Sequence, residues 1–283
     1  MQATQEKWDI VITPNRKWYE LNLKEVLKYK DLIFLFVKRS FSAQYKQTIL
    51  GPLWFIINPL ISSFVSTIIF GNIAGIESDG IPYFLFYLTG YTLWNYFNAC
   101  VTETSATFTN NAGVMGKVYF PRLTMPIASV IYAAINMLIV FTLTIITISI
   151  YWGQGVVIKP NWTFILIPIY MCQTAALGLG TGIIVSSLTT KYRDLSILVG
   201  FGLSLWMYLT PVVYPMSSVN GLLKTLILIN PMSSIIQNFK YALLGCGTFE
   251  VNFWICSLVI TLLIDLIGIL LFNKVEKTFM DTV

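Results

Sequence analysis

The side chains that most often carry acid–base, metal or phosphate chemistry are scarce in this sequence. The 283 residues include no histidine, the commonest general base and metal ligand. Four cysteines (Cys100, Cys172, Cys246 and Cys256) show neither metal nor disulfide spacing, and we interpret them as small core residues. No glycine-rich GxxxxGK(S/T) phosphate loop occurs, so any ATP chemistry must belong to another chain. We therefore expect no catalytic residue, no metal and no cofactor in this chain.

Two carboxylates lie in or near apolar stretches. Asp265 lies within one, where a charge costs on the order of 2.5–3.5 kcal/mol at worst, and we interpret it as a buried, paired or protonated structural group. Glu103 lies near the end of another stretch and can reach lipid headgroups. Such sparse charge argues against an ion-coupled transporter or a proton relay. The LGLGTG run at Leu177–Gly182 is typical of close helix packing rather than of phosphate binding.

The composition predicts a membrane protein. Hydrophobic residues make up 56% of the chain and charged residues only 11%, with a mean hydropathy of +0.72. A soluble protein of this length needs more charge on its surface, so we predict an all-α integral membrane protein. Several apolar segments approach the ~20 residues that cross a bilayer as a helix. Six such segments span about residues 51–72, 82–104, 123–150, 162–188, 195–213 and 251–272.

The chain before the first apolar segment divides in two. Residues 1–22 are polar with scattered aromatics, and we interpret them as a cytoplasmic lead-in. Residues 23–49 predict an amphipathic helix along the membrane surface, because apolar side chains recur at i, i+3, i+4 and i+8 from Ile33, beside lysines and an arginine. An ordinary amphipathic helix on a soluble domain is the alternative. Residues 50–283 then form a domain of six transmembrane helices.

A corner joins the surface helix to the first span. The stretch YKQTILGPLWFIINP begins with Tyr45 and Lys46 at the end of the surface helix. Gly51 and Pro52 follow at the junction, where proline suits the first turn of a helix because it needs no hydrogen-bond acceptor there. The surface helix should therefore lie along the membrane while the next helix enters the hydrocarbon.

The positions of lysine and arginine predict the orientation. With the N-terminus inside, fifteen of the 18 basic residues fall on cytoplasmic segments. The outer loops hold only Lys159, Lys224 and Lys240. This distribution follows the positive-inside rule, so both termini are predicted to be cytoplasmic.

Two connections differ from plain loops. The stretch from Pro215 to Gly245 is apolar and broken by Asn230-Pro231, which favours two short helices at or dipping into the outer face; a seventh span is the alternative. The inner loop from Phe108 to Arg122 predicts a short helix with an apolar tip, a shape that a partner's groove can hold. A solvated connector is the alternative for this loop.

Four motifs carry a resemblance to a known family. They are YKQTILGPLWFIINP at Tyr45–Pro59, GKVYFPR at Gly116–Arg122, KYRDL at Lys191–Leu195, and TPVVYP with INPMSSII within Thr210–Ile236. Because these motifs occur in the order typical of that family, the chain resembles the permease subunit of ABC-type polysaccharide exporters, which moves O-antigen, capsule and teichoic acid chains. One departure is Lys240, where the family is expected to favour arginine, whose planar bidentate hydrogen bonding a lysine cannot reproduce.

The resemblance implies partners and a location. It implies a permease homodimer in the bacterial inner membrane, surrounded by lipids, with two ABC ATPase subunits that bind ATP and Mg. It implies a lipid-linked glycan as the substrate, an outer gate in the Pro215–Gly245 helices, and no nucleic-acid partner. It also implies two ATPase-coupling contacts, one in each of two inner loops. Their residues are Asn111, Val114, Met115 and Lys117 in the first loop, and Tyr192, Arg193 and Asp194 in the second.

Aromatic side chains are the candidates for the wall of a glycan channel. A sugar chain presents apolar C–H faces between its hydroxyls, so flat aromatic walls with few fixed charges would let each unit bind weakly and move on. The candidates are Trp54, Phe55, Tyr87, Tyr91, Trp94, Phe97, Trp206, Tyr208 and Tyr214. Aromatic belts also form at membrane interfaces whatever the function. For Tyr91 and Trp94, which lie deeper, lining and packing roles are both open.

Other functions compete with glycan export. A related permease could export a drug or a small lipid, and the chain could also be a scaffold subunit without transport of its own. A membrane-embedded glycosyl- or acyltransferase would need converging acids or a histidine, which this sequence lacks. An ATPase that co-purifies with the chain would favour the exporters.

Overall fold

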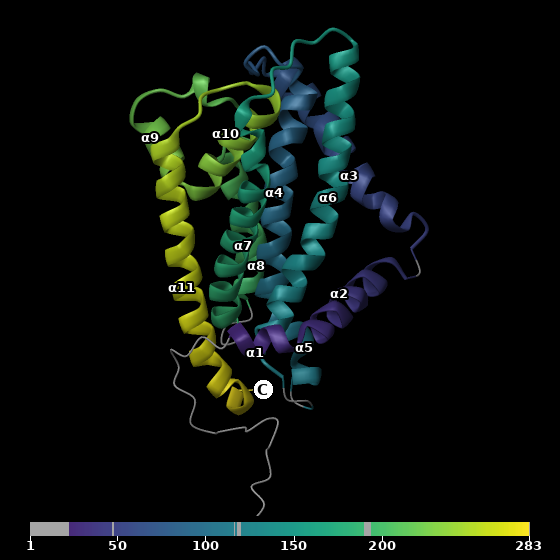
Figure 1. Ribbon diagram of the computed structural model, residues 1–283, viewed down its shortest axis with the longest axis vertical. Coiled ribbons are helices and arrows are strands. Elements are labelled where there is room, and N and C mark those ends of the chain that lie inside the picture. Colours follow the sequence, from purple (N-terminus) through teal and green to yellow (C-terminus); the bar gives the residue numbers. More distant parts are fainter. Residues whose placement is uncertain (1–22, 47, 116, 118–119, 190–193, 283) are drawn as a thin grey trace, which may run out of the picture.

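The computed structural model describes residues 23–46, 48–115, 117, 120–189 and 194–282, and the regular structure within these ranges is helical (Figure 1). The predicted lead-in lies outside the described residues. The helices are α1 (Leu23–Lys28), α2 (Lys30–Tyr45), α3 (Trp54–Ser66), α4 (Tyr83–Ser105), α5 (Thr107–Met115), α6 (Thr124–Gly153), α7 (Ile167–Thr189), α8 (Leu195–Tyr208), α9 (Gly221–Ile229), α10 (Pro231–Leu244) and α11 (Val251–Thr282). The predicted all-helical fold is confirmed for these residues.

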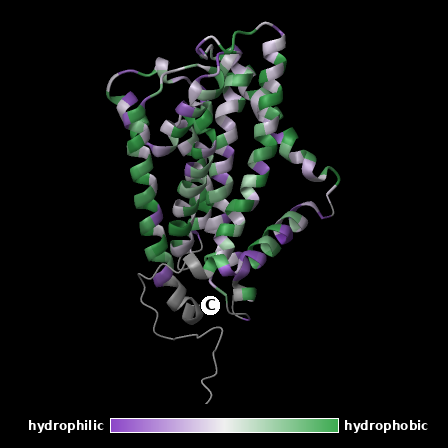
Figure 2. Cartoon of the chain, in the orientation of Figure 1, coloured by the Kyte–Doolittle hydropathy of each residue, from purple (hydrophilic) through white to green (hydrophobic). Residues whose placement is uncertain are grey.

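Four stretches are long and apolar enough to cross a membrane. These are Gly51–Ile73, Thr124–Gly153, Trp162–Thr189 and Val251–Lys274, and apolar residues cover much of their length in Figure 2. The first includes α3 with the short 3-10 and π-helical turns at its two ends. α4 has 23 residues but is less apolar, and α8 has only 14. The chain is therefore an integral membrane protein, and the count of six spans stays a prediction.

Glycines let α7 pack closely between α4 and α11. A methyl group on Gly178 would lie 2.5 Å from the Cβ of Cys100 on α4, and one on Gly182 would lie 2.6 Å from Thr104 of the same helix. On another face, a methyl on Gly180 would lie 2.3 Å from the Asp265 carboxylate of α11. Small residues let helix backbones approach where lipid offers no hydrophobic driving force. The packing interpretation of the LGLGTG run is confirmed.

Different helices lie at the two ends of the bundle (Figure 1). We call the end that holds α1, α2 and α5 the α5 end, and the opposite end the α9 end (Figure 1). α2 packs against α6 through Ile33 and Val37, whereas Phe34 and Leu35 on its other side are exposed. α2 and α3 then diverge from a corner that projects away from the bundle (Figure 1). Gly51 stands at this corner with a φ of +49°, a conformation that favours glycine.

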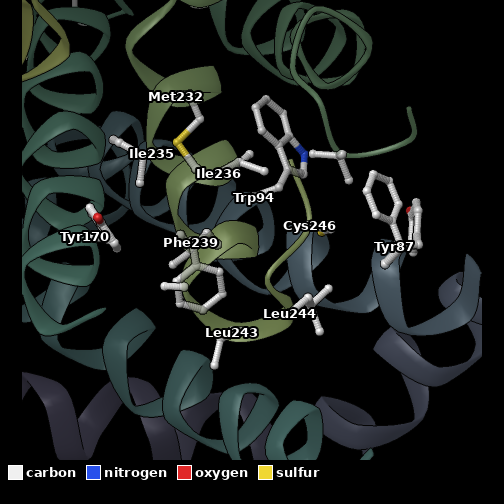
Figure 3. Packing of buried hydrophobic residues seen from close by; sticks show 14 of the residues in the cluster. Tyr87, Trp94, Tyr170, Met232, Ile235, Ile236, Phe239, Leu243, Leu244 and Cys246 are labelled. Atoms are coloured by element: carbon white, nitrogen blue, oxygen red, sulfur yellow. The ribbon is translucent and has the colours of Figure 1, made fainter. Parts of the chain in front are cut away.

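Two short helices, α9 and α10, occupy the predicted apolar connection near the α9 end. Every residue of α10 except Tyr241 is buried, and Met232, Ile235 and Phe239 lie in the main core (Figure 3). α10 packs against α4, α7 and α11. This helix is therefore part of the core and does not lie on the molecular surface.

Candidate functional site

Two adjoining cavities lie in the angle between the corner and the bundle. The first, which we call the helix-end cavity, has a volume of about 420 Å³ and lies between α2, α4, α5 and α6 at the α5 end. The second, which we call the elbow cavity, has about 200 Å³ and lies between the corner, α4 and α6. Gln44, Glu103 and Tyr132 line both. The surface helix, the corner and the bundle thus build one hollow together.

The elbow cavity combines aromatic rings with side-chain amides. Trp54 and Tyr91 are among its rings, and its amides come from α3, α4 and α6: Asn58, Asn95 and Asn136. The Asn136 Oδ1 is buried and has no hydrogen-bond partner in the described part of the chain. Amides donate and accept hydrogen bonds, and rings offer flat apolar faces. This chemistry suits a neutral ligand rich in hydroxyl groups.

Three of the nine predicted channel aromatics line the elbow cavity. They are Trp54, Phe55 and Tyr91. The buried Tyr87 stacks on Tyr91 with a centroid separation of 5.7 Å and holds that ring from behind. The structure therefore brings four of the predicted aromatics together.

The other predicted aromatics are not at this cavity. Trp94 and Phe97 are buried, and Phe97 meets Trp206 edge-on at 5.2 Å, so they pack the core of the protomer and do not line its hollow. For Trp94 this is the packing role that the sequence left open. Tyr208 is exposed at the end of α8, and the Tyr214 hydroxyl donates to its carbonyl oxygen at 3.2 Å.

The predicted corner residues connect α2 to the hollow. The Tyr45 ring packs edge-on against Phe55 at 5.0 Å, and the Tyr132 hydroxyl donates to the Gln44 Oε1 at 2.5 Å. Burial is the main cause that raises the pKa of the Tyr45 phenol above its ordinary value, and the neighbouring Tyr132 raises it further. The phenol therefore stays protonated. Lys46 is exposed.

The predicted coupling residues are only partly described. The Asn111 Nδ2 donates to the Thr107 carbonyl at 3.1 Å, and the Asn111 side chain lines the helix-end cavity. Val114 packs against the cluster around Phe108 and is half-buried, so it is no free apolar tip. Lys117 and Asp194 are exposed. The side chain of Met115 and the whole of Tyr192 and Arg193 lie outside the described residues.

A second arrangement of polar contacts lies at the α9 end. After α8 the chain runs without helix to Pro215, and its carbonyls accept hydrogen bonds from side chains instead of from helical N–H groups. The Asn230 Nδ2 and the Ser233 Oγ each donate to the Leu209 carbonyl at 3.2 Å. The Tyr83 hydroxyl donates to the Val213 carbonyl at 2.5 Å. The INPMSSII motif is thus bound to the end of the α8 segment, directly before the TPVVYP motif.

Lys240 supplies the central contact of this arrangement. Its Nζ donates to the carbonyls of Pro211 at 2.7 Å and Val212 at 3.1 Å, and it lies 3.3 Å from the centroid of the Phe86 ring. A Cβ on Gly90 would lie 2.7 Å from the lysine Cε, so only glycine leaves room there. The side chain is 1% exposed. Lys240 therefore lies in a buried helix of the connection between α8 and α11, where its side chain is enclosed by protein and does not face water.

The long apolar helices and the hollow beside them are features of a membrane transport protein. The family model described as "ABC-2 type transporter" matches residues 31–244, so the chain belongs to this family. Similar proteins include two from Klebsiella pneumoniae and one from Myxococcus xanthus, each named O-antigen export system permease protein RfbA. The Klebsiella relatives are 28% identical over 92% of this chain and 98% of the relative, and 25% identical over 89% and 94%. The Myxococcus relative is 25% identical over 77% of this chain and 82% of the relative.

Proposed function

We propose that this chain is the membrane-spanning subunit of an ATP-driven exporter that carries a lipid-linked polysaccharide across the bacterial inner membrane. The observation that carries the proposal is the alignment with O-antigen export permeases over most of both chains. The elbow cavity supports it, because rings and amides suit a glycan and Glu103 is the charged residue of the lining. In this proposal the chain has six spans, an interface helix formed by α1 and α2, and both termini on the cytoplasmic side.

The channel is proposed to form between two copies of the chain. α8 buries only Leu203 and exposes apolar side chains such as Phe201 and Leu205. Methyl groups added to Gly200 and Gly202 on the same helix would meet nothing within 4 Å. An apolar helix with small residues can approach a partner helix closely. A second copy against α8 would enclose a path beside the two corners, with Trp54 and Tyr91 on its wall.

The energy is proposed to come from two ATPase subunits below the α5 end. ATP and Mg would bind to those subunits. The two inner loops are proposed to contact the ATPase through α5 and through the start of α8. The exposed Lys117 and Asp194 offer charged groups at these contacts. An exposed ion pair between one of these groups and the ATPase contributes only about 0–1 kcal/mol, so most of the docking energy must come from apolar contacts. α9 and α10 are the proposed outer gate.

Deletion of the gene and complementation test this function. The deletion strain should accumulate a lipid-linked glycan on the inner side and lose it from the surface, and the wild-type chain should restore export. Trp54→Ala and Asn136→Ala should restore less export at equal membrane levels than Trp162→Ala, a control outside both cavities. Full export with both cavity variants would contradict the role of the elbow cavity, and unchanged surface glycan in the deletion strain would contradict glycan export.

A further inference from the structure

The helix-end cavity holds two opposite charges that the described residues leave unpaired. Arg39 of α2 and Glu103 of α4 both line this cavity. Within the described ranges, neither side chain forms an ion pair or a hydrogen bond with another residue. Opposite charges in one cavity that do not pair with each other are complementary to a ligand that carries both signs.

Neutral donors surround the positive side of the cavity. Ser40 and Gln44 follow Arg39 on the same side of α2, and the small Ala43 between them leaves space. The Gln44 Oε1 is occupied by the Tyr132 hydroxyl, so its Nε2 remains available as a donor. Asn110 contributes a further amide from α5. A guanidinium among amides and hydroxyls is the donor set that a phosphate group prefers.

The cavity lies where a bilayer has its headgroups. Glu103 is in the last turn of α4, and Met125 and Ser129 are in the first two turns of α6, so the cavity is at the end of two long helices. The exposed Phe34 and Leu35 on α2 place apolar side chains next to it. Such a helix lies at the boundary between hydrocarbon and water.

We propose that the helix-end cavity binds the phosphoethanolamine headgroup of a membrane phospholipid. The phosphate lies against Arg39 and the neighbouring amides, and the ammonium donates to the Glu103 carboxylate. The lipid would connect α2 to α4 and α6 and so fix the angle of the corner. This site adjoins the elbow cavity and shares Gln44, Glu103 and Tyr132 with it, but it requires only that the bundle lies in a membrane.

Other lipid headgroups fit the two charges less well. A polyprenyl pyrophosphate or an anionic phospholipid brings negative charge without a cation for Glu103, so the carboxylate would repel it. A phosphocholine brings a cation that has no N–H to donate. The unpaired carboxylate is therefore the feature that selects ethanolamine.

Lipid retention by the full-length protein tests the proposal. The protein is reconstituted in vesicles of equal parts phosphatidylethanolamine and phosphatidylglycerol, extracted in mild detergent, and examined by native mass spectrometry for lipid retained per chain. Wild type should retain phosphatidylethanolamine preferentially. Glu103→Gln and Arg39→Gln should each lower that retention about tenfold or more, the effect of losing one hydrogen bond to a charged group. Asp31→Asn and Lys38→Gln, exposed residues of α2 that do not line the cavity, should leave it unchanged.

Further arms separate the lipid from other sources of the same chemistry. Glycerophosphoethanolamine should displace the retained lipid, and inorganic phosphate should not. A short polyprenyl pyrophosphate should bind Glu103→Gln better than wild type. Arg39→Lys, which keeps the charge, should retain most of the lipid and so show that loss in Arg39→Gln is not misfolding. Equal retention in wild type and Glu103→Gln, displacement by inorganic phosphate, or stronger pyrophosphate binding by wild type would each overturn the proposal. Lipid retention is measured without any glycan, so its outcome is independent of glycan export, which the deletion strain measures.

Discussion

At the scale of single residues, the side chains that matter most are polar groups enclosed by protein. Lys240 donates to two backbone carbonyls that no helix satisfies, and Phe86 lies against its ammonium. A buried carbonyl without a donor costs free energy, so the lysine stabilises the chain after α8 by satisfying its backbone. Tyr132 acts similarly on α2 through Gln44. In both places one long side chain joins segments distant in sequence.

Lys240→Met should destabilise the α9 end of the bundle. Methionine has a similar length but donates no hydrogen bond, so the Pro211 and Val212 carbonyls would lose their donor. The expected loss is roughly 1–3 kcal/mol for each carbonyl left unsatisfied. Thermal unfolding in detergent should show a lower apparent midpoint than for Lys224→Met, a half-buried lysine of α9. Equal midpoints for the two variants would show that these contacts add no stability.

The stability that depends on Lys240 should change with pH. Burial lowers the pKa of Lys240 to about 7 from 10.5, and the neighbouring Cys246 and Asp79 only partly oppose this. Between these values the unfolded chain holds a proton that the folded chain does not, so stability rises with pH from about 7 to about 10.5. The neutral amine still has two N–H groups for its two carbonyls. The difference in midpoint between wild type and Lys240→Met should therefore be larger at pH 9 than at pH 7; a constant difference would contradict the lowered pKa.

At the scale of elements, α7 and the corner set the geometry in different ways. α7 lies close to its neighbours because its glycines leave room for them. The corner depends on backbone conformation, since nothing but the Thr48 hydroxyl, at 3.9 Å, would meet a Cβ on Gly51 while its φ is +49°. A larger residue at an α7 glycine would therefore collide with a neighbouring helix, whereas a larger residue at Gly51 would strain the backbone.

Gly182→Ala should weaken the contact between α4 and α7. The new methyl would lie 2.6 Å from the Thr104 Cβ and 3.1 Å from the Val101 carbonyl, so one helix must move. Overpacking of this kind costs about 1–3 kcal/mol. Gly153→Ala at the end of α6 is the matched control, because its methyl would meet nothing within 4 Å. The yield of monodisperse protein and its apparent unfolding temperature should fall only for Gly182→Ala, and equal behaviour would show that the helices adapt freely.

At the scale of the whole molecule, the bundle has one end that meets the proposed ATPase and another that holds the proposed gate. α5 and the start of α8 lie at the first, and α9 with the chain before it lies at the second (Figure 1). The two ends are connected by long helices such as α6, whose 30 residues extend about 45 Å at 1.5 Å per residue. A movement at one end can therefore reach the other through rigid elements.

Labelling of single cysteines should reveal which end faces outward. In a background with the four native cysteines replaced by alanine, a cysteine at Ser218 should react with an impermeant reagent added to intact cells. One at Thr109, exposed at the opposite end, should react only after permeabilisation. The positive-inside distribution is the physical reason. Labelling of the Thr109 position in intact cells would reverse the proposed orientation and with it the site of ATPase docking.

The sequence by itself determined the class of this protein and the places of its helices. Long apolar segments must become helices in a bilayer, since every backbone group has to be hydrogen-bonded internally, and the corner at Gly51 and the break at Asn230 follow from local backbone chemistry. Tertiary structure alone decided which aromatics line a cavity and which fill the core. Trp94 and Tyr91 are only three positions apart on α4, yet one is buried and the other lines the elbow cavity.

Lys240 shows the same division. Its stretch was predicted to be helical, but the carbonyls that it contacts come from another segment, and no local pattern encodes a contact across 28 or 29 residues. The presence of Arg39 and Glu103 in one cavity likewise depends on how α2 crosses the bundle. Helix formation is local and can be predicted from spacing, whereas the direction of a side chain depends on the helix that packs against it.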